Sequence, residues 1–169
     1  MILGRADLLA LLTDLSSALA HQGIRKLVVL NGHGGNDFRQ MIRELETRVE
    51  VFICAINWWT CVSGAEYFDE PGDHAGEMET SVMMVLEPEL LLPLAEAGSG
   101  KARKFRVAGL REGWAWAPRE WSKVTTDTGT GNPAASTRGK GEKFLKAVTE
   151  RIGGFLVDFA AADLNNMYE

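Results

Sequence analysis

The sequence has few cysteines and no long apolar run, and both absences exclude classes of protein. Cys54 and Cys61 are the only cysteines among 169 residues. Two are too few for a disulfide framework, and the absence of a CxxC pair gives no sign of a cysteine-bound zinc. No segment reaches membrane-spanning length. The first residues lack the basic start and the cleavage site of a signal peptide. We therefore expect a cytoplasmic protein with no membrane partner.

Positive charge is also scarce. The formal net charge is -5, from 18 Lys and Arg against 23 Asp and Glu. Binding of nucleic acid requires clustered cations, so we expect no nucleic-acid partner. The C-terminal third is locally basic, over residues 101–106 and 138–146, and we interpret these cations as a solvated surface. Hydrophobic residues make up 46% and charged residues 24% of the chain, which predicts one folded globular domain over residues 1–169.

Apolar spacing in the first third of the chain alternates between two periods. A helical period over residues 6–22 is followed by a β-branched run over 24–30, and the same order repeats at 37–49 and 51–56. Helices and strands that alternate along the chain in this way predict an α/β fold with a mainly parallel sheet. Ligands bind such sheets outside the carboxyl ends of the strands, where the turn at residues 31–36 lies.

The rest of the chain is less regular. Residues 57–73 form a long connection with many aromatic side chains, which favours a functional loop. We predict a helix over 75–86, a short strand or helical turn over 90–94, loop with one short strand over 105–124, and a long helix over 136–162 that its glycines weaken.

His33 stands alone in a Gly-rich turn at the end of a predicted strand. Gly32, Gly34 and Gly35 allow a tight turn that leaves the imidazole projecting over the sheet edge. The turn lacks the GxGxxG spacing and the Lys-Ser/Thr pair of phosphate-binding loops. Residues on strand-end loops often carry function, so His33 is a candidate ligand or catalyst.

A second turn gathers His74 with Asp73, Glu77 and Glu79. Clusters of His, Glu and Asp are the ligands of hydrolytic metal sites. On a regular helix Glu77 shares a face with His74 and Glu79 does not. This argument fails if His74 still lies on the turn, and a carboxylate in a first helical turn can simply stabilise the helix dipole. Which glutamate serves the site therefore stays open.

The two turns and the tail resemble the signatures of the creatininase (creatinine amidohydrolase) family. The matching segments are NGHGGN at 31–36, HAGEMETS at 74–81 and TGTGNPAASTRGKGE at 128–142. The resemblance implies a three-layer α/β/α fold and a homo-oligomer, a hexamer in the family. It also implies hydrolysis of a C–N bond in a small, often cyclic, amide-type substrate. The cofactor would be a pair of divalent metals, zinc or manganese, with iron as a further option.

The resemblance also assigns roles to residues. His33 and Glu79 would be metal ligands, His74 would act as acid and base or steady the tetrahedral intermediate, and Glu77 is the second catalytic candidate. Aromatic side chains would wall the substrate pocket, although plain packing explains aromatic residues as readily. These candidates for substrate binding are Trp58, Trp59, Tyr67 and Trp116.

The chain departs from the family pattern in two places. Creatininase has a carboxylate where this chain has Gly35, which disfavours creatinine as substrate. The family's Glu-x-His and Pro-x-x-Thr-Asp segments do not occur before His33. We therefore expect an N-terminally truncated domain, the C-terminal two thirds of the family domain, with two metals bound only if the missing ligands are supplied. Two alternatives stay open: a relative acting on a peptide or modified nucleotide precursor, and an inactive or assembly domain.

Overall fold

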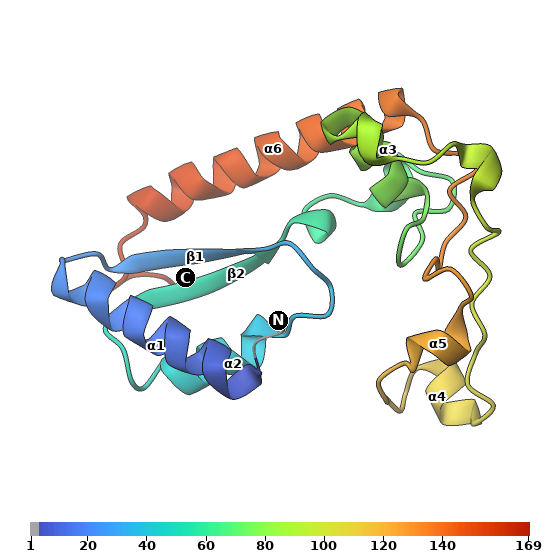
Figure 1. Ribbon diagram of the computed structural model, residues 1–169. Helices are drawn as coiled ribbons and strands as arrows, with labels where there is room; N and C mark the ends of the chain where they lie inside the picture. Colours follow the sequence, from blue (N-terminus) through green and yellow to red (C-terminus); the bar gives the residue numbers. More distant parts are fainter. Residues whose placement is uncertain (1–3) are drawn as a thin grey trace. The chain divides into compact units, whose positions relative to one another are not determined.

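The computed structural model describes residues 4–169, which divide into two compact units. The first unit contains the chain up to Cys61 together with Glu150–Glu169, and the second is Val62–Thr149. The prediction of a single domain stays a prediction. In the first unit lie α1 (Arg5–His21), β1 (Lys26–Asn31), α2 (Phe38–Leu45), β2 (Phe52–Asn57) and the C-terminal half of α6 (Arg138–Ala161), as Figure 1 shows.

The first helix and both strands follow the sequence pattern closely. Helix α1 begins where the backbone N–H of Gly4 donates to the Asp7 carboxylate at 3.2 Å, and it ends before Gly23, whose φ is +80°. Only glycine adopts such a φ at little cost, so the chain turns there. Strands β1 and β2 pair in parallel, from Lys26 opposite Phe52 to Asn31 opposite Asn57. The predicted parallel sheet is confirmed, with two strands among residues 4–169.

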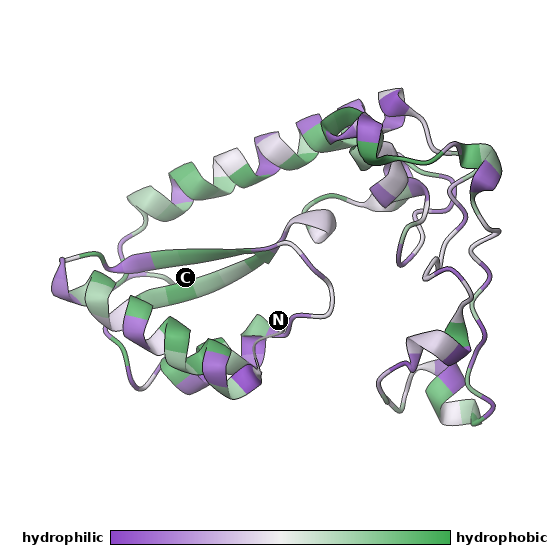
Figure 2. Cartoon of the chain, in the orientation of Figure 1, coloured by the Kyte–Doolittle hydropathy of each residue, from purple (hydrophilic) through white to green (hydrophobic). Residues whose placement is uncertain are grey.

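Helices cover both faces of the strand pair within the first unit. On one face Leu12 of α1 and Met41 and Leu45 of α2 form a buried core, against which Ile53 of β2 packs. Successive strand residues point to opposite faces, and Phe52 contacts Phe159 of α6 with ring centroids 5.7 Å apart. Figure 2 shows the apolar residues of the strands between these helices. The unit therefore has three layers, helix, sheet and helix.

Lys26 closes the C-terminal end of α6. Its ammonium group donates to the carbonyl oxygens of Phe159, Ala160 and Ala162 at 2.7, 2.8 and 2.5 Å. The last carbonyls of a helix have no partner within the helix and carry partial negative charge. A cation at the start of β1 therefore satisfies them and ties α6 to the sheet.

The second unit is built around α3 (Glu77–Leu86) and the first half of α6. Phe68, Val82, Phe144 and Val148 are buried there, and the ring of Phe144 meets that of Phe68 at 5.1 Å. The predicted helix over 75–86 is confirmed, beginning two residues later. The predicted long helix is also confirmed, and its glycines do not interrupt it.

Residues 105–124 depart from expectation. We expected loop with one short strand, and this is wrong, because the segment contains two short helices, α4 (Ala108–Glu112) and α5 (Trp121–Val124). Helices of one turn carry too few residues to show a period. Within residues 88–96 the structure has two 3-10 turns, Pro88–Leu90 and Leu94–Glu96, and residues 91–93 between them are neither helix nor strand, so neither alternative spans residues 90–94. None of the helices in residues 4–169 combines the length and apolar character needed to cross a bilayer.

Replacing Lys26 by Met should lower the free energy of unfolding by about 1–2 kcal/mol, because three helix-end carbonyls lose their cation. Urea denaturation followed by circular dichroism measures the change. Lys143→Met removes the same charge from an exposed position on α6 and serves as control. Equal losses in the two variants would show that Lys26 does not cap the helix.

Two glycines of α6 should respond in opposite directions to alanine. A Cβ at Gly141 would collide with the backbone carbonyl of Ser81, whereas a Cβ at Gly153 meets nothing within 4 Å. We expect Gly141→Ala to destabilise the protein by about 2 kcal/mol or more. We expect Gly153→Ala to stabilise it by about 0.5–1 kcal/mol, since alanine favours the helix. Thermal unfolding of both variants checks the contrast, and stabilisation by Gly141→Ala would contradict the close approach of α3 and α6.

Candidate functional site

Asn31 organises the turn that carries His33. This last residue of β1 is 2% exposed, and its amide donates to the side-chain oxygen of Asn57 at 2.8 Å. Its own side-chain oxygen accepts from the backbone N–H of His33 and from the amide of Asn36, both at 3.1 Å. A buried amide with every group satisfied holds its neighbours in one geometry. The turn at the carboxyl end of β1 is therefore fixed from beneath.

His33 is exposed, and one ring nitrogen is already engaged. The backbone N–H of Gly35 donates to its Nδ1 at 3.0 Å, which in a neutral ring places the proton on Nε2. A Cβ at position 35 would come within 2.9 Å of the His33 ring. Gly35, where creatininase has a carboxylate, thus gives the imidazole its room. A metal at Nδ1 would take the place of the Gly35 hydrogen bond.

The second turn is held by the third family-like segment. The backbone N–H of Asp73 donates to Thr130 at 3.1 Å, and that of Thr130 donates to His74 at 2.8 Å. A Cβ at Gly131 would lie 2.8 Å from the Cα atoms of both Gly72 and Gly76. Two of the three sequence signatures therefore meet in the second unit, at backbone contact distance.

His74 lies beside Glu79. Oε2 of Glu79 accepts from the backbone N–H of Ala75 at 2.7 Å and stands 3.8 Å from Nδ1 of His74. Both side chains are about 40% exposed, at 39% and 42%. Because α3 begins only at Glu77, His74 belongs to the turn, and the argument from a regular helix does not apply to it. The ring of Trp121 lies 5.2 Å from the His74 ring, a neighbour that the sequence analysis missed.

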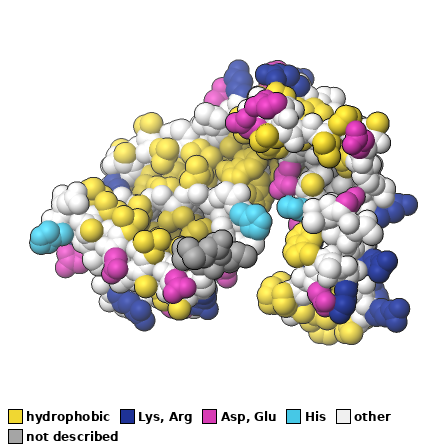
Figure 3. All heavy atoms as spheres, viewed as in Figure 1, with side chains coloured by type: hydrophobic (Ala, Val, Ile, Leu, Met, Phe, Trp, Pro, Cys, Tyr) yellow, Lys and Arg dark blue, Asp and Glu magenta, His cyan; other side chains and the backbone are white. Residues whose placement is uncertain are grey.

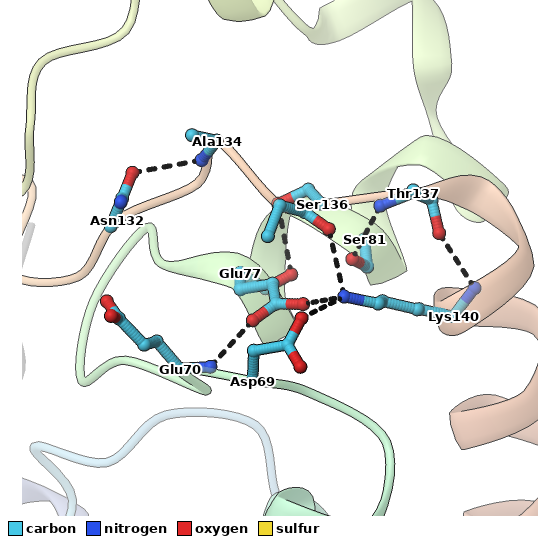
Figure 4. A network of polar contacts seen from close by, with 10 residues as sticks. Asp69, Glu70, Glu77, Ser81, Asn132, Ala134, Ser136, Thr137 and Lys140 are labelled. Atoms are coloured by element: carbon cyan, nitrogen blue, oxygen red, sulfur yellow. Dashed lines mark hydrogen bonds and ion pairs between the residues drawn. The ribbon is translucent and has the colours of Figure 1, made fainter.

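Glu77 belongs to a separate polar network around Lys140, shown in Figure 4. Its side chain is 0% exposed, its Oε2 accepts from the backbone N–H of Glu70 at 2.8 Å, and its Oε1 pairs with Lys140. Lys140 also bonds Asp69 at 2.9 Å and the carbonyl of Ala135 at 3.1 Å. Both oxygens of the Glu77 carboxylate are thus occupied by the fold itself.

The electrostatics of Lys140 follow from these contacts. The hydrogen bond to Glu77, and after it the one to Asp69, raise the pKa of Lys140, and partial desolvation opposes them. Our interpretation of Lys140 as part of a solvated surface is wrong, since its partner is fully buried. Nothing in the spacing of the sequence marks Lys140 as the partner of Glu77, because the two residues lie 63 positions apart.

The predicted substrate-binding aromatics are dispersed over the two units. Trp58 and Trp59 belong to the first unit, where Trp59 lies near Gly34. Tyr67 packs on Phe144 with centroids 5.5 Å apart, which is core packing in the second unit. Trp116 is 85% exposed. None of these contacts tests substrate binding, so the four assignments stay predictions.

A small cavity lies at the carboxyl ends of the two strands in the first unit. It measures about 280 Å³, and its lining includes Asn36, Asn57, Thr60 and Cys61. Burial raises the pKa of the Cys61 thiol, an effect that Arg151 partly opposes, and burial raises that of Cys54. A raised pKa leaves less of the reactive thiolate, so the geometry does not favour a cysteine nucleophile.

The side chains that could bind a divalent metal are of suitable types, but too few of them lie together. Imidazole and carboxylate are suitable ligands for zinc, which in catalytic sites takes about three from the protein. Within residues 4–169 no group of three His, Cys, Asp or Glu side chains is placed to hold a metal ion. His74 and Glu79 form a pair in the second unit, and His33 belongs to the first. The described side chains therefore supply only part of the ligand set that a catalytic zinc takes.

Comparison with known proteins identifies a family for this chain. Residues 1–156 match the family described as creatinine amidohydrolase. A putative creatinine amidohydrolase from Bacteroides fragilis is 45% identical, with a TM-score of 0.89 over 100% of this chain and 66% of its own. The chain thus spans just under two thirds of that relative. No curated protein matches the chain.

Two further solved structures share the fold at lower identity. A creatininase superposes with a TM-score of 0.74 at 21% identity, over 96% of this chain and 67% of its own. A creatininase mutant of the Zn-Zn type gives 0.68 at 22%, over 96% and 67%. The fold is therefore the α/β fold of creatininase, as the sequence predicts. The chain belongs to the creatininase family.

The Glu77–Lys140 pair should make stability depend on pH at the alkaline end. Folding raises the pKa of Lys140. The ion pair therefore contributes fully to the free energy of unfolding below the unfolded-state pKa of about 10.4, and this contribution is lost as pH rises through the folded-state pKa. We expect Lys140→Met to lower Tm at about pH 8, with the gap to the wild type narrowing towards about pH 11. Lys143→Met, at an exposed position, controls for the general effect of charge, and a constant gap for Lys140→Met would contradict the pairing.

Proposed function

We propose that this chain takes part in metal-dependent hydrolysis of a C–N bond in a small, cyclic or open, amide-type substrate. The observation that carries the proposal is the pair of His74 and Glu79. Both side chains are partly exposed, Nδ1 of His74 lies 3.8 Å from Oε2 of Glu79, and the pair joins a turn to the first turn of α3 within the stretch matched to the family. A titratable imidazole beside a carboxylate at an accessible site is the arrangement that general acid and base catalysis uses.

The orientation of His74 suggests how it would handle a proton. Nδ1 faces Glu79, so Nε2 is the nitrogen left for exchange with substrate, and it has no hydrogen-bond partner among the described residues. His74 would thus carry a proton to the leaving nitrogen of the amide.

Glu79 and His33 remain the proposed metal ligands, each in its own unit. Oε2 of Glu79 is held by Ala75, while Oε1 has no hydrogen-bond partner within residues 4–169 and is open to a cation. A bound zinc or manganese would supply a water of lowered pKa and polarise the substrate carbonyl. Zinc is named for one structure of the same fold.

We assign Glu77 a positioning role in place of the catalytic role first considered. Its carboxylate anchors the start of α3 to Lys140, two residues before Glu79. Trp121, next to His74, joins the proposed wall of the substrate site. Assembly into a homo-oligomer, such as a hexamer, stays part of the proposal.

Activity measurements on variants test the assignment of His74. With zinc or manganese added, His74→Asn should lower kcat by about 10²–10⁴-fold on a panel of lactams and formamides, with a smaller effect on KM, since proton transfer is lost. His21→Asn, at the exposed end of α1, is the matched control and should leave kcat unchanged. Equal activity in the wild type and His74→Asn would contradict this role.

Metal content tests the ligands independently of turnover. Elemental analysis of His33→Ala and Glu79→Gln should show less bound metal than the wild type, while Glu77→Gln should keep metal if folded. Unchanged metal in His33→Ala would contradict its assignment. A wild-type chain that neither retains metal nor gains activity with added zinc or manganese would argue against the proposed function.

A further inference from the structure

A groove in the second unit lies outside the family signatures. It is built by residues 102–124, which carry α4 and α5, and its volume is about 670 Å³. A hydrogen bond from the backbone N–H of Arg103 to the carbonyl of Val124, at 2.8 Å, joins the two ends of this segment. The groove therefore belongs to a closed loop of chain with its own backbone support.

The side chains that line the groove are mainly cationic, although the protein as a whole carries a net negative charge. Six cationic side chains and one carboxylate line it, whereas the whole chain has a net charge of -5. Figure 3 shows Lys and Arg gathered over the part of the chain that carries α4 and α5. Local potential of one sign in a hollow concentrates ligands of the opposite sign.

Most of this positive charge is not neutralised by the protein. Arg119 pairs with Asp73, and Lys123 pairs with Glu120 at 2.8 Å. The other four cations have no carboxylate partner among the described residues. These four are Arg103, Lys104, Arg106 and Arg111.

One of the four is held in place by the backbone. Nη1 of Arg111 donates to the carbonyl oxygens of Phe105 and Arg106, at 3.5 and 3.0 Å. Its guanidinium is thus oriented before any ligand arrives, which lowers the entropy cost of binding.

Apolar surface accompanies the charge. Phe105, Leu110 and Trp116 also line the groove. A volume in the range of about 300–1,000 Å³ suits a small molecule. A single strand of nucleic acid would need a longer track with successive stacking platforms. The lining fits a compact ligand that has an anionic end and an apolar body.

The groove is connected to the candidate site through Arg119. Besides its bond to Asp73, the residue before His74, Arg119 stacks on Trp121 at 4.6 Å from the ring centre. Trp121 in turn lies against His74. A ligand in the groove would therefore contact Arg119, whose neighbour Trp121 lies beside the proposed proton carrier.

We propose that this groove binds a carboxylate or phosphate group of a small ligand and so selects acidic amides as substrates. The binding of the anion is inferred from the groove alone, whereas the selection of substrates rests on the proposed function. Arg103, Lys104, Arg106 and Arg111 receive the anionic group, and Trp116 and Phe105 contact the apolar body.

Calorimetric titration of the full chain with sodium pyrophosphate and with sodium citrate tests the proposal. At low salt we expect Kd at or below about 1 mM, rising with ionic strength. Arg103→Gln with Arg106→Gln should weaken binding about tenfold or more, through loss of charge. The matched control, Arg43→Gln with Arg48→Gln, removes two exposed cations from the first unit and should leave Kd unchanged. Preference for pyrophosphate identifies a phosphate site, and preference for citrate a carboxylate site.

Several results would overturn the proposal. They are no binding of either anion, equal weakening in the groove and control variants, or tight binding of a single-stranded oligonucleotide without binding of small anions. Circular dichroism verifies that the variants fold, and Lys104→Gln with Arg106→Gln replaces the first pair if it does not. Because the titration needs no turnover, anion binding by a chain that cleaves no amide would refute the proposed function while the groove assignment stands. In an active preparation, the groove variant should raise KM for acidic amides more than KM for neutral amides.

Discussion

The ion pair between the buried carboxylate of Glu77 and the partly exposed Lys140 is the constraint on which the arrangement of the second unit depends. A carboxylate with no exposed surface is tolerated only when it is paired and hydrogen-bonded. Glu77 is the first residue of α3, and Lys140 stands in the first turn of α6. Their contact therefore fixes where both helices begin relative to one another, and the start of α3 sets the place of Glu79 beside His74.

Much of the fold could be predicted from the sequence because its longer elements carry a clear period. Helix α1 and the two strands lie within about two residues of their predicted bounds, an ordinary margin for element ends. The choice between Glu77 and Glu79 could not be made that way. The angular argument required His74 to lie on the helix, and it does not apply because α3 begins only at Glu77.

The neighbours of the site could not be predicted because they come from distant parts of the chain. Trp121 contacts His74, Thr130 pairs with its backbone, and Lys140 reaches Glu77 across 63 positions. Composition and spacing describe what lies close along the chain, whereas these contacts arise only when α3, α5 and α6 pack. The glycines at 72, 76 and 131 are intelligible in the same way, since each makes room for a segment far away in sequence.

The hydrogen bond from Gly35 to His33 has a consequence for any cation that the imidazole binds. While Nδ1 accepts from the backbone, the neutral ring carries its proton on Nε2, so neither nitrogen offers a free lone pair. Coordination must therefore break that bond or move the proton, at a cost of about 1 kcal/mol. This cost corresponds to about a fivefold reduction in affinity for the cation. The hydrogen bond of the Gly35 backbone would therefore differ between the free and the coordinated ring.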